Sequence, residues 1–225
     1  KPVADIRIDG AGKKVTRSDN CRVSDLSVSS DNLTFTYEAK SLPYPIDTSY
    51  YDNEKHTQAD ALSVISFMDE MNYEGLSVSG LSDGYYGLTI GGEFIGRFTA
   101  RELERGINMA LLQNTPQYKQ AMKIRQMNEE RWLKERKMRE FYWVEYNLMR
   151  KTGMLWACDE AAVDTLRKYR PHDIFLQWNG DLWLQYMHKG IREDCVNEQQ
   201  NLVDRIYEQN KPIPLRIEIK KFTDL

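Results

Sequence analysis

The chain has 225 residues, a net charge of −3 and 41% apolar residues. This length supports one large domain or two small ones, and the composition is typical of a globular protein. The negative balance gives no general attraction to nucleic acid, and no stretch reaches the roughly 18 apolar residues of a membrane span. The chain begins without a signal peptide or an initiator Met, so we expect a processed chain or the later part of a longer one.

Strand patterns dominate the first 98 residues. Residues 4–9 predict a short strand with Ile6 and Ile8 on one face, and residues 22–40 alternate at period two around a polar turn. The apolar positions of the first arm lose register near Ser24 and Asp25, which indicates a β-bulge. This region therefore predicts antiparallel hairpins.

The next segment mixes a loop, a helix and further strands. Prolines mark residues 41–58 as a loop. Residues 60–72 place Leu62, Ile65, Met68 and Met71 near helical spacing, which predicts a helix that packs on the sheet. Residues 75–92 return to strands and end at Gly91-Gly92, a pair that suits a tight hairpin because glycine tolerates positive φ.

The stretch LTIGGEFIGRFTARELERGIN, residues 88–108, predicts a hairpin that leads directly into a helix. Thr99 and Glu102 form the T-x-x-E pattern of a capping box. Leu103, Ile107 and Leu111 follow at four-residue spacing, which predicts one apolar stripe on that helix. None of these parts is a nucleophile, a general base or a metal ligand.

Helical patterns dominate residues 99–210. Thr115 and Pro116 predict the start of a helix that continues to about Lys151, and its basic face is partly neutralised by glutamates, as on a solvated helix. Asp159 predicts a cap for the helix at 160–169. Residues 193–210 predict another helix, and residues 215–222 predict a closing strand. The inward positions predicted for residues 193–210 are Val196, Leu202 or Val203, and Ile206.

The fold class predicted from these elements is α+β. Antiparallel hairpins and helices form the N-terminal half, and a long helix and further helices form the C-terminal half, which ends in a short strand. We predict a β-rich module with a capped helix at 1–112 and a helical region with the C-terminal strand at 113–225; a single continuous domain stays open.

The sequence offers little catalytic chemistry. His56, His172 and His188 lie in polar contexts without zinc-binding spacing, and there is no nucleophile elbow or phosphate-binding loop. Cys21, Cys158 and Cys195 form no C-x-x-C pair, so we expect buried free thiols, with a Cys158–Cys195 disulfide as the alternative. We therefore predict no catalytic residue, no metal and no cofactor. An unrecognised enzyme would require His172 or His188 to meet a carboxylate and a serine.

Aromatic residues are the remaining candidates for binding. Trp178, Trp183 and Tyr186 could stack against sugar rings if they were exposed on one flat face, although aromatics at near-helical spacing more often form a core or an interface. The aromatics of the long helix are interpreted in the same way, as packing against the first half or a partner domain. These are Trp132, Phe141, Tyr142 and Trp143.

One long run of the chain resembles a known family. The run YYGLTIGGEFIGRFTARELERGINMALLQNTPQYKQA, residues 85–121, is similar to the segment that follows the catalytic domain in many bacterial, Bacteroides-like SGNH/GDSL-type hydrolases. Gly91 stands where that family usually has Asp. Further matches lie at residues 22–47, 128–155 and 206–219, so that the resemblance covers nearly the whole chain.

The resemblance implies an ester hydrolase, a lipase or esterase that often deacylates glycans, in the periplasm or secreted. The family's catalytic serine lies in a Gly-Asp-Ser block and its histidine in an Asp-x-x-His block, and neither block occurs here. We therefore expect an inactive accessory domain that braces or gates the catalytic domain of the same parent protein or mediates dimerisation. A homo-oligomer and a glycan are further partners left open, and a carbohydrate-binding module is the alternative function.

Overall fold

The computed structural model describes residues 2–47, 50–51 and 56–222, and its packing divides the chain into two compact units. We call Lys1–Arg125 with Gln209–Leu225 the sheet unit and Gln126–Glu208 the helical unit. The chain is α+β, as the sequence predicts. The boundary between residues 112 and 113 stays a prediction; by packing, the C-terminal strand belongs with the sheet unit.

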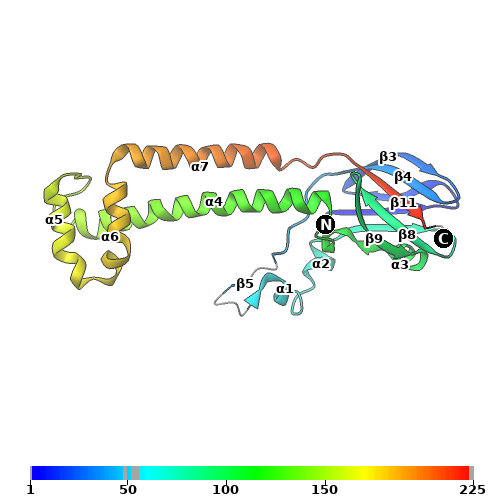
Figure 1. Cartoon of the computed structure of the whole chain (residues 1–225), viewed down its shortest axis with the longest axis horizontal. Helices are drawn as coiled ribbons and strands as arrows, with labels where there is room; N and C mark the ends of the chain where they lie inside the picture. The colour runs from blue at the N-terminus through cyan, green and yellow to red at the C-terminus, as the bar shows by residue number, and fades with distance from the viewer. Residues whose placement is uncertain (1, 48–49, 52–55, 223–225) are drawn as a thin grey trace. The chain divides into compact units, whose positions relative to one another are not determined.

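The sheet unit contains two main sheets (Figure 1). Buried apolar side chains from both sheets form one core. The first sheet has the order β10 (Ile107–Asn108), β7 (Glu74–Ser79), β1 (Ala4–Asp9), β2 (Lys14–Asp19). The second has the order β3 (Cys21–Val28), β4 (Asn32–Ala39), β11 (Leu215–Lys221), β8 (Tyr85–Ile90), β9 (Glu93–Thr99). A separate pair joins β5 (Tyr50–Tyr51) to β6 (His56–Thr57). Ile6, Phe35 and Ile217 come from both main sheets and are fully buried together.

Most of the predicted strands are confirmed. The β3–β4 register shifts between Ser24 and Ser27, and Asp25 has a φ of 54°, which confirms the bulge. The closing strand β11 lies between β4 and β8 and is antiparallel to both. Two features were not predicted: the exposed strand β2, whose side chains lack an apolar alternation, and the parallel pairing of β1 with β7.

The hairpin and the capping box are confirmed. Gly91 and Gly92 both have positive φ, at 59° and 84°, and connect β8 to β9. The Glu102 amide donates to Thr99 Oγ1 at 3.1 Å, and the Thr99 amide donates to Glu102 Oε2 at 2.7 Å. The reciprocal bonds satisfy two amides that the first turn of a helix leaves unpaired.

The apolar stripe predicted beyond this cap is wrong. Helix α3 (Ala100–Arg105) ends at Gly106, whose φ of 94° is outside the helical range. Ile107 then pairs with β7 as part of β10, and Leu111 is exposed. Pairing with an existing sheet edge therefore overrides the helical spacing of the sequence.

The single helix predicted at residues 60–72 is also wrong. Two one-turn helices replace it, α1 (Gln58–Ala61) and α2 (Phe67–Glu70). Met68 packs with Ile46 and Ala110, whereas Ile65 and Met71 are exposed. A helix this short depends on buried contacts for its stability, and only one of the four predicted positions is fully buried.

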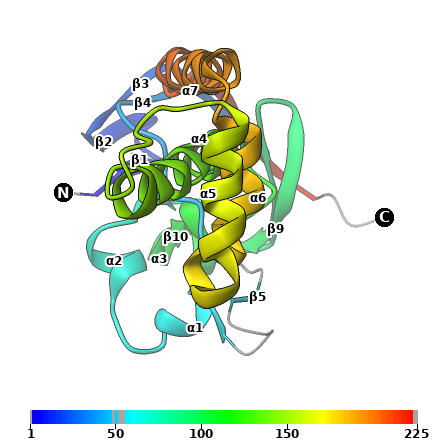
Figure 2. The ribbon, with the colours of Figure 1, turned by 90° about the vertical axis from the view of Figure 1, so that its left-hand side faces the viewer.

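The helical unit is built from four helices. They are α4 (Pro116–Val144), α5 (Glu160–Tyr169), α6 (Ile174–Tyr186) and α7 (Lys189–Gln209), of which α4 and α7 also extend into the sheet unit. Figure 1 and Figure 2 show α4 and α7 side by side, with α5 and α6 across one end of the pair. Between α4 and α7, the Lys134 ammonium contacts the Glu198 carboxylate, and the Cys195 thiol points at the Lys134 carbonyl oxygen at 3.7 Å.

The predicted starts of α4 and α5 are confirmed. α4 begins at Pro116, and the Tyr118 amide donates to Thr115 Oγ1 at 3.3 Å. At the start of α5, the Ala162 amide donates to Asp159 Oδ1 at 3.0 Å. A π-helical segment, Glu145–Met149, follows α4 directly.

Several predicted burial states differ from the structure. In α7, which begins four residues before the predicted start, Leu202 is buried but Val196 is exposed. Cys21 and Cys195 are buried free thiols, whereas Cys158 is exposed and forms no disulfide with Cys195. Phe141 packs inside the core of the helical unit itself. None of the helices in the described residues has the length and apolar character needed to cross a membrane.

Candidate binding site in the helical unit

The helical unit lacks the parts of a serine hydrolase site. His172 and His188 both lie in residues 126–208, but every serine of the chain lies outside that range. No serine–histidine pair can therefore form within this unit. The side chain of His56 lies outside the described part of the structure. Across the described residues, no cluster of three or more His, Cys, Asp or Glu side chains could hold a metal ion.

Aromatic residues are concentrated in this unit instead. All five tryptophans of the chain fall within residues 126–208. Exposed large aromatics lie on all four helices and in the segments between them; they are Trp132, Tyr142, Tyr146, Trp156, Tyr169, Phe175, Trp178 and Tyr207. Exposed apolar groups that lie close together mark binding surfaces more often than scattered ones do.

The structure does not bring the three predicted sugar-binding residues together on a surface. Trp183 is 0% exposed and Tyr186 is 6% exposed, whereas Trp178 is 66% exposed. Trp183 and Tyr186 are three positions apart on α6 and share its inner face, but Trp178 is five positions from Trp183 and lies on another face. Trp178 packs edge-on against Phe175, and sugar binding by Trp178, Trp183 and Tyr186 stays a prediction that the burial of two of them disfavours.

A buried carboxylate lies at the centre of the helical unit. Glu145 is almost fully buried at the first position of the π-helical segment, where its carbonyl accepts the Arg150 amide at 2.8 Å. Its Oε1 accepts the Trp183 indole N–H at 2.8 Å, and its Oε2 accepts the Trp156 amide at 2.9 Å. Glu145 therefore joins the core tryptophan to a tryptophan at the surface.

Trp156 adopts an unusual backbone conformation. Its φ is 63°, a left-handed value that is rare for a bulky residue and costs roughly 1–3 kcal/mol. The hydrogen bond from its amide to a buried carboxylate offsets part of this cost. Its ring is 45% exposed and contacts Tyr142 and Tyr146, with ring centroids 6.0 Å and 5.9 Å away. These contacts fix the direction in which the indole faces solvent.

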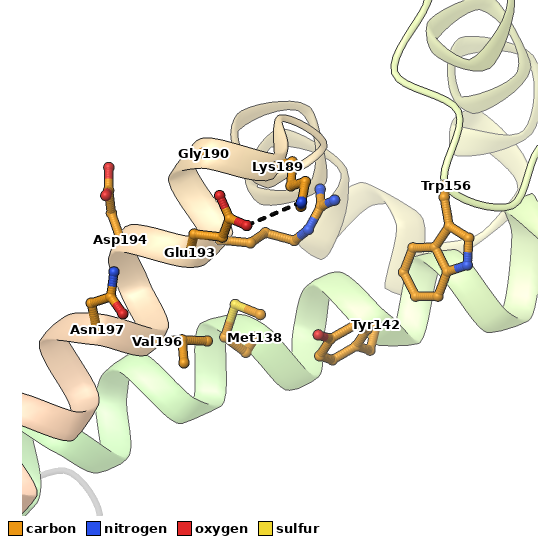
Figure 3. A pocket seen from close by; sticks show the side chains of 10 residues that line it. Met138, Tyr142, Trp156, Lys189, Gly190, Glu193, Asp194, Val196 and Asn197 are labelled. Carbon is orange, nitrogen blue, oxygen red and sulfur yellow. Dashed lines mark ion pairs between the residues drawn. The ribbon is translucent and has the colours of Figure 1, made fainter.

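Trp156 lines an open groove of about 600 Å³ (Figure 3). Met138 and Tyr142 line it from α4, and the first turns of α7 carry Val196 and a set of polar side chains. These polar side chains are Lys189, Arg192, Glu193, Asp194 and Asn197. The groove therefore combines aromatic rings with hydrogen-bonding groups.

Three of the charged groups in this groove have partners within the unit. The Lys189 ammonium lies 3.2 Å from Glu193 Oε1. Arg192 donates to the carbonyl oxygens of Tyr186 and Met187, both at 2.6 Å, and its guanidinium lies 4.8 Å above the Phe141 ring. Arg192 thus caps the C-terminal end of α6 and packs on the core residue Phe141. Asp194 and Asn197 remain exposed at the groove surface.

A second cavity of about 350 Å³ lies on another side of the helical unit. It is lined by Trp143, Asn147, Leu148, Lys151, Thr152, Tyr169, His172, Asp173 and Leu176. The Asp173 carboxylate accepts the Phe175 and Leu176 amides at 2.8 Å and 3.2 Å, which caps α6. Because this carboxylate is used by the cap, it is poorly suited to orient His172 as a base.

The sheet unit has a buried carboxyl of its own. Tyr37 donates its hydroxyl to Glu74 Oε1 at 2.8 Å, and Gln117 Nε2 lies 3.3 Å from both carboxyl oxygens. Burial raises the pKa of Glu74 to about 7. Glu74 is 0% exposed and therefore out of reach of a substrate, so we interpret it as a structural group.

Known proteins share this architecture. A family model described as the diltiazem deacetylase C-terminal helical domain matches residues 122–211, a range that includes the whole helical unit. The solved structure of BT4096, a gut microbial diltiazem-metabolizing enzyme, matches with a TM-score of 0.92 and 35% sequence identity. This chain is similar to half of that enzyme. The match covers 99% of this chain and 50% of the other, and no curated protein matches.

Proposed function

We propose that this chain is a non-catalytic accessory region of an esterase-like enzyme. The observation that carries the proposal is the match of nearly the whole chain to only half of a diltiazem-metabolizing enzyme. Ester hydrolysis by covalent catalysis needs a nucleophile and an oriented base. The absence of serine from residues 126–208 supports placing those groups outside the helical unit.

The finer proposal is an SGNH/GDSL-type ester hydrolase, secreted or periplasmic. It rests on the resemblance of residues 85–121 to the segment after the catalytic domain in that family. The region would brace or gate the catalytic domain or mediate dimerisation. The exposed aromatics of the helical unit favour such a docking role, because aromatic residues are enriched at protein interfaces.

An ester-hydrolysis assay on two proteins tests this proposal. We expect the isolated chain to give no hydrolysis of p-nitrophenyl acetate above buffer. A chimera in which this chain replaces the matching half of BT4096 should retain most of that enzyme's turnover of diltiazem. Truncated BT4096 without that half is the control. Turnover by the isolated chain that a serine-directed inhibitor abolishes would contradict the proposal, as would an inactive but folded chimera.

A further inference from the structure

The groove beside Trp156 has the features of a ligand site that the sequence does not indicate. We propose that it binds a neutral sugar ring, with the indole of Trp156 as the stacking platform and the first turns of α7 as the polar wall. The lining residues come from α4, from the segment that follows the π-helical turn and from α7 (Figure 3). None of the three aromatics considered for sugar binding in the sequence lies in it.

The platform is positioned before any ligand arrives. Glu145 accepts the Trp156 amide at 2.9 Å and thereby stabilises a backbone conformation with a φ of 63°. Tyr142 and Tyr146 meet the indole ring edge-on, at interplanar angles of 87° and 86°. A fixed ring loses little conformational entropy when a ligand binds, and unusual backbone conformations of this kind cluster at ligand sites.

The polar wall favours a ligand without net charge. Two cationic groups, Lys189 and Arg192, and two anionic groups, Glu193 and Asp194, line the groove, so that their charges cancel. Asn197 adds an amide that can both donate and accept hydrogen bonds. A polyhydroxylated ring can pair with these groups at its edge.

An apolar ligand fits the same groove less well. It would cover Asp194 and Asn197 without offering them hydrogen bonds, and buried polar groups without partners are unfavourable. A sugar ring presents an apolar face to the indole and hydroxyls to the wall. The volume of about 600 Å³ lies within the roughly 300–1,000 Å³ typical of ligand pockets.

Isothermal titration calorimetry with neutral oligosaccharides tests the site. The probes are cellohexaose, xylohexaose and mannohexaose, each titrated to millimolar concentration into the full chain. We expect saturable binding of at least one of them, weakened about tenfold or more by Trp156→Ala and less by Trp156→Phe. Trp178→Ala is the matched control, because it removes another exposed tryptophan of the same unit, and it should leave binding unchanged.

Near-UV circular dichroism shows whether each variant keeps its packing. Asp194→Asn with Asn197→Ala provides a second test, since this pair alters the polar wall but not the aromatic core, and it should also weaken binding. The proposal fails if no probe binds, or if Trp178→Ala rather than Trp156→Ala abolishes binding. It also fails if 1-anilinonaphthalene-8-sulfonate binds at Trp156 while the oligosaccharides do not. Sugar binding is measured without ester turnover, so it stands or falls independently of the proposed function.

Discussion

The two units use a buried glutamate in different ways. In the sheet unit, Glu74 is enclosed by Tyr37 and Gln117, and all three side chains are buried. In the helical unit, Glu145 contacts the buried Trp183 on one side and the backbone of the exposed Trp156 on the other. The Glu74 side chain therefore forms hydrogen bonds only with buried side chains, whereas the Glu145 side chain forms hydrogen bonds with one core residue and one surface residue.

This difference indicates where binding occurs. The largest buried aromatics of the sheet unit, Phe35, Tyr37 and Tyr86, fill its own core. The helical unit places Tyr142, Trp156 and other rings at the surface, beside a groove. The sheet unit exposes aromatic residues as well, among them Tyr85 and Phe94, but the groove lined by Tyr142 and Trp156 lies in the helical unit, where we propose that binding occurs.

The largest expected effect is on stability, from removing the buried Trp183 that donates to Glu145. Trp183→Ala removes a fully buried side chain and one of the two donors to Glu145, so we expect a loss of about 3–5 kcal/mol in the free energy of unfolding. Urea unfolding followed by tryptophan fluorescence reports on the helical unit, which holds every tryptophan. Trp178→Ala should change stability by only about 0.5 kcal/mol. Equal losses in both variants would remove the distinction between core and surface rings.

The second prediction concerns the contribution of Glu74 to the pH dependence of the unfolding free energy. Burial raises its pKa from 4.5 to about 7, so the folded chain keeps this proton over a range in which the unfolded chain has lost it. The stability contributed by Glu74 is fully present below pH 4.5 and is lost as the pH rises through 7, by on the order of 3 kcal/mol. Glu74→Gln should abolish this slope between pH 4.5 and 7 in urea unfolding followed by far-UV circular dichroism. The same slope in both proteins would show that other groups cause it.

A third prediction concerns the hydrogen bond between Glu145 and the amide of the exposed Trp156. Glu145→Gln leaves one acceptor oxygen for two donors, so one of the Trp156 and Trp183 hydrogen bonds must be lost. We expect a loss of about 1–3 kcal/mol in unfolding free energy. Amide hydrogen exchange at Trp156 should become faster. Unchanged exchange there would mean that the carboxylate does not hold this segment.

The smallest effect concerns the sheet unit alone. Thr99→Ala removes the acceptor of the Glu102 amide and should reduce stability by about 1 kcal/mol, as other cap deletions do. Glu104→Gln changes a charge on the same helix outside the cap and serves as the control. Thermal unfolding compares the two variants. A Thr99→Ala protein as stable as the control would show that the capping box contributes nothing to stability.

Local signals in the sequence predict much of this fold. The Gly91-Gly92 turn, the Thr99 cap and the Asp159 cap depend on neighbouring residues and are confirmed. The remaining secondary structure and burial depend on contacts with residues that are distant in sequence. Ile107 leaves its helical pattern because the edge of β7 is available. Trp183 is buried in the core of the helical unit, and its indole N–H is paired there by Glu145, 38 positions away.

The candidate site was harder to predict for the same reason. Trp156 lies in an irregular segment between helices, where sequence periodicity gives no information about which residues face solvent. Its position depends on Glu145, eleven residues earlier, and on residues of α7 more than thirty positions later. The tryptophan content of residues 126–208 was a visible signal, but only the fold separates buried from exposed rings.

The most direct test of an accessory, non-catalytic role is intact-mass spectrometry after treatment with a fluorophosphonate that labels activated serines. A serine esterase treated in the same way is the positive control. We expect the mass of this chain to stay unchanged, because we infer that no serine in it is activated for attack. A stoichiometric adduct on any serine of this chain would contradict that role.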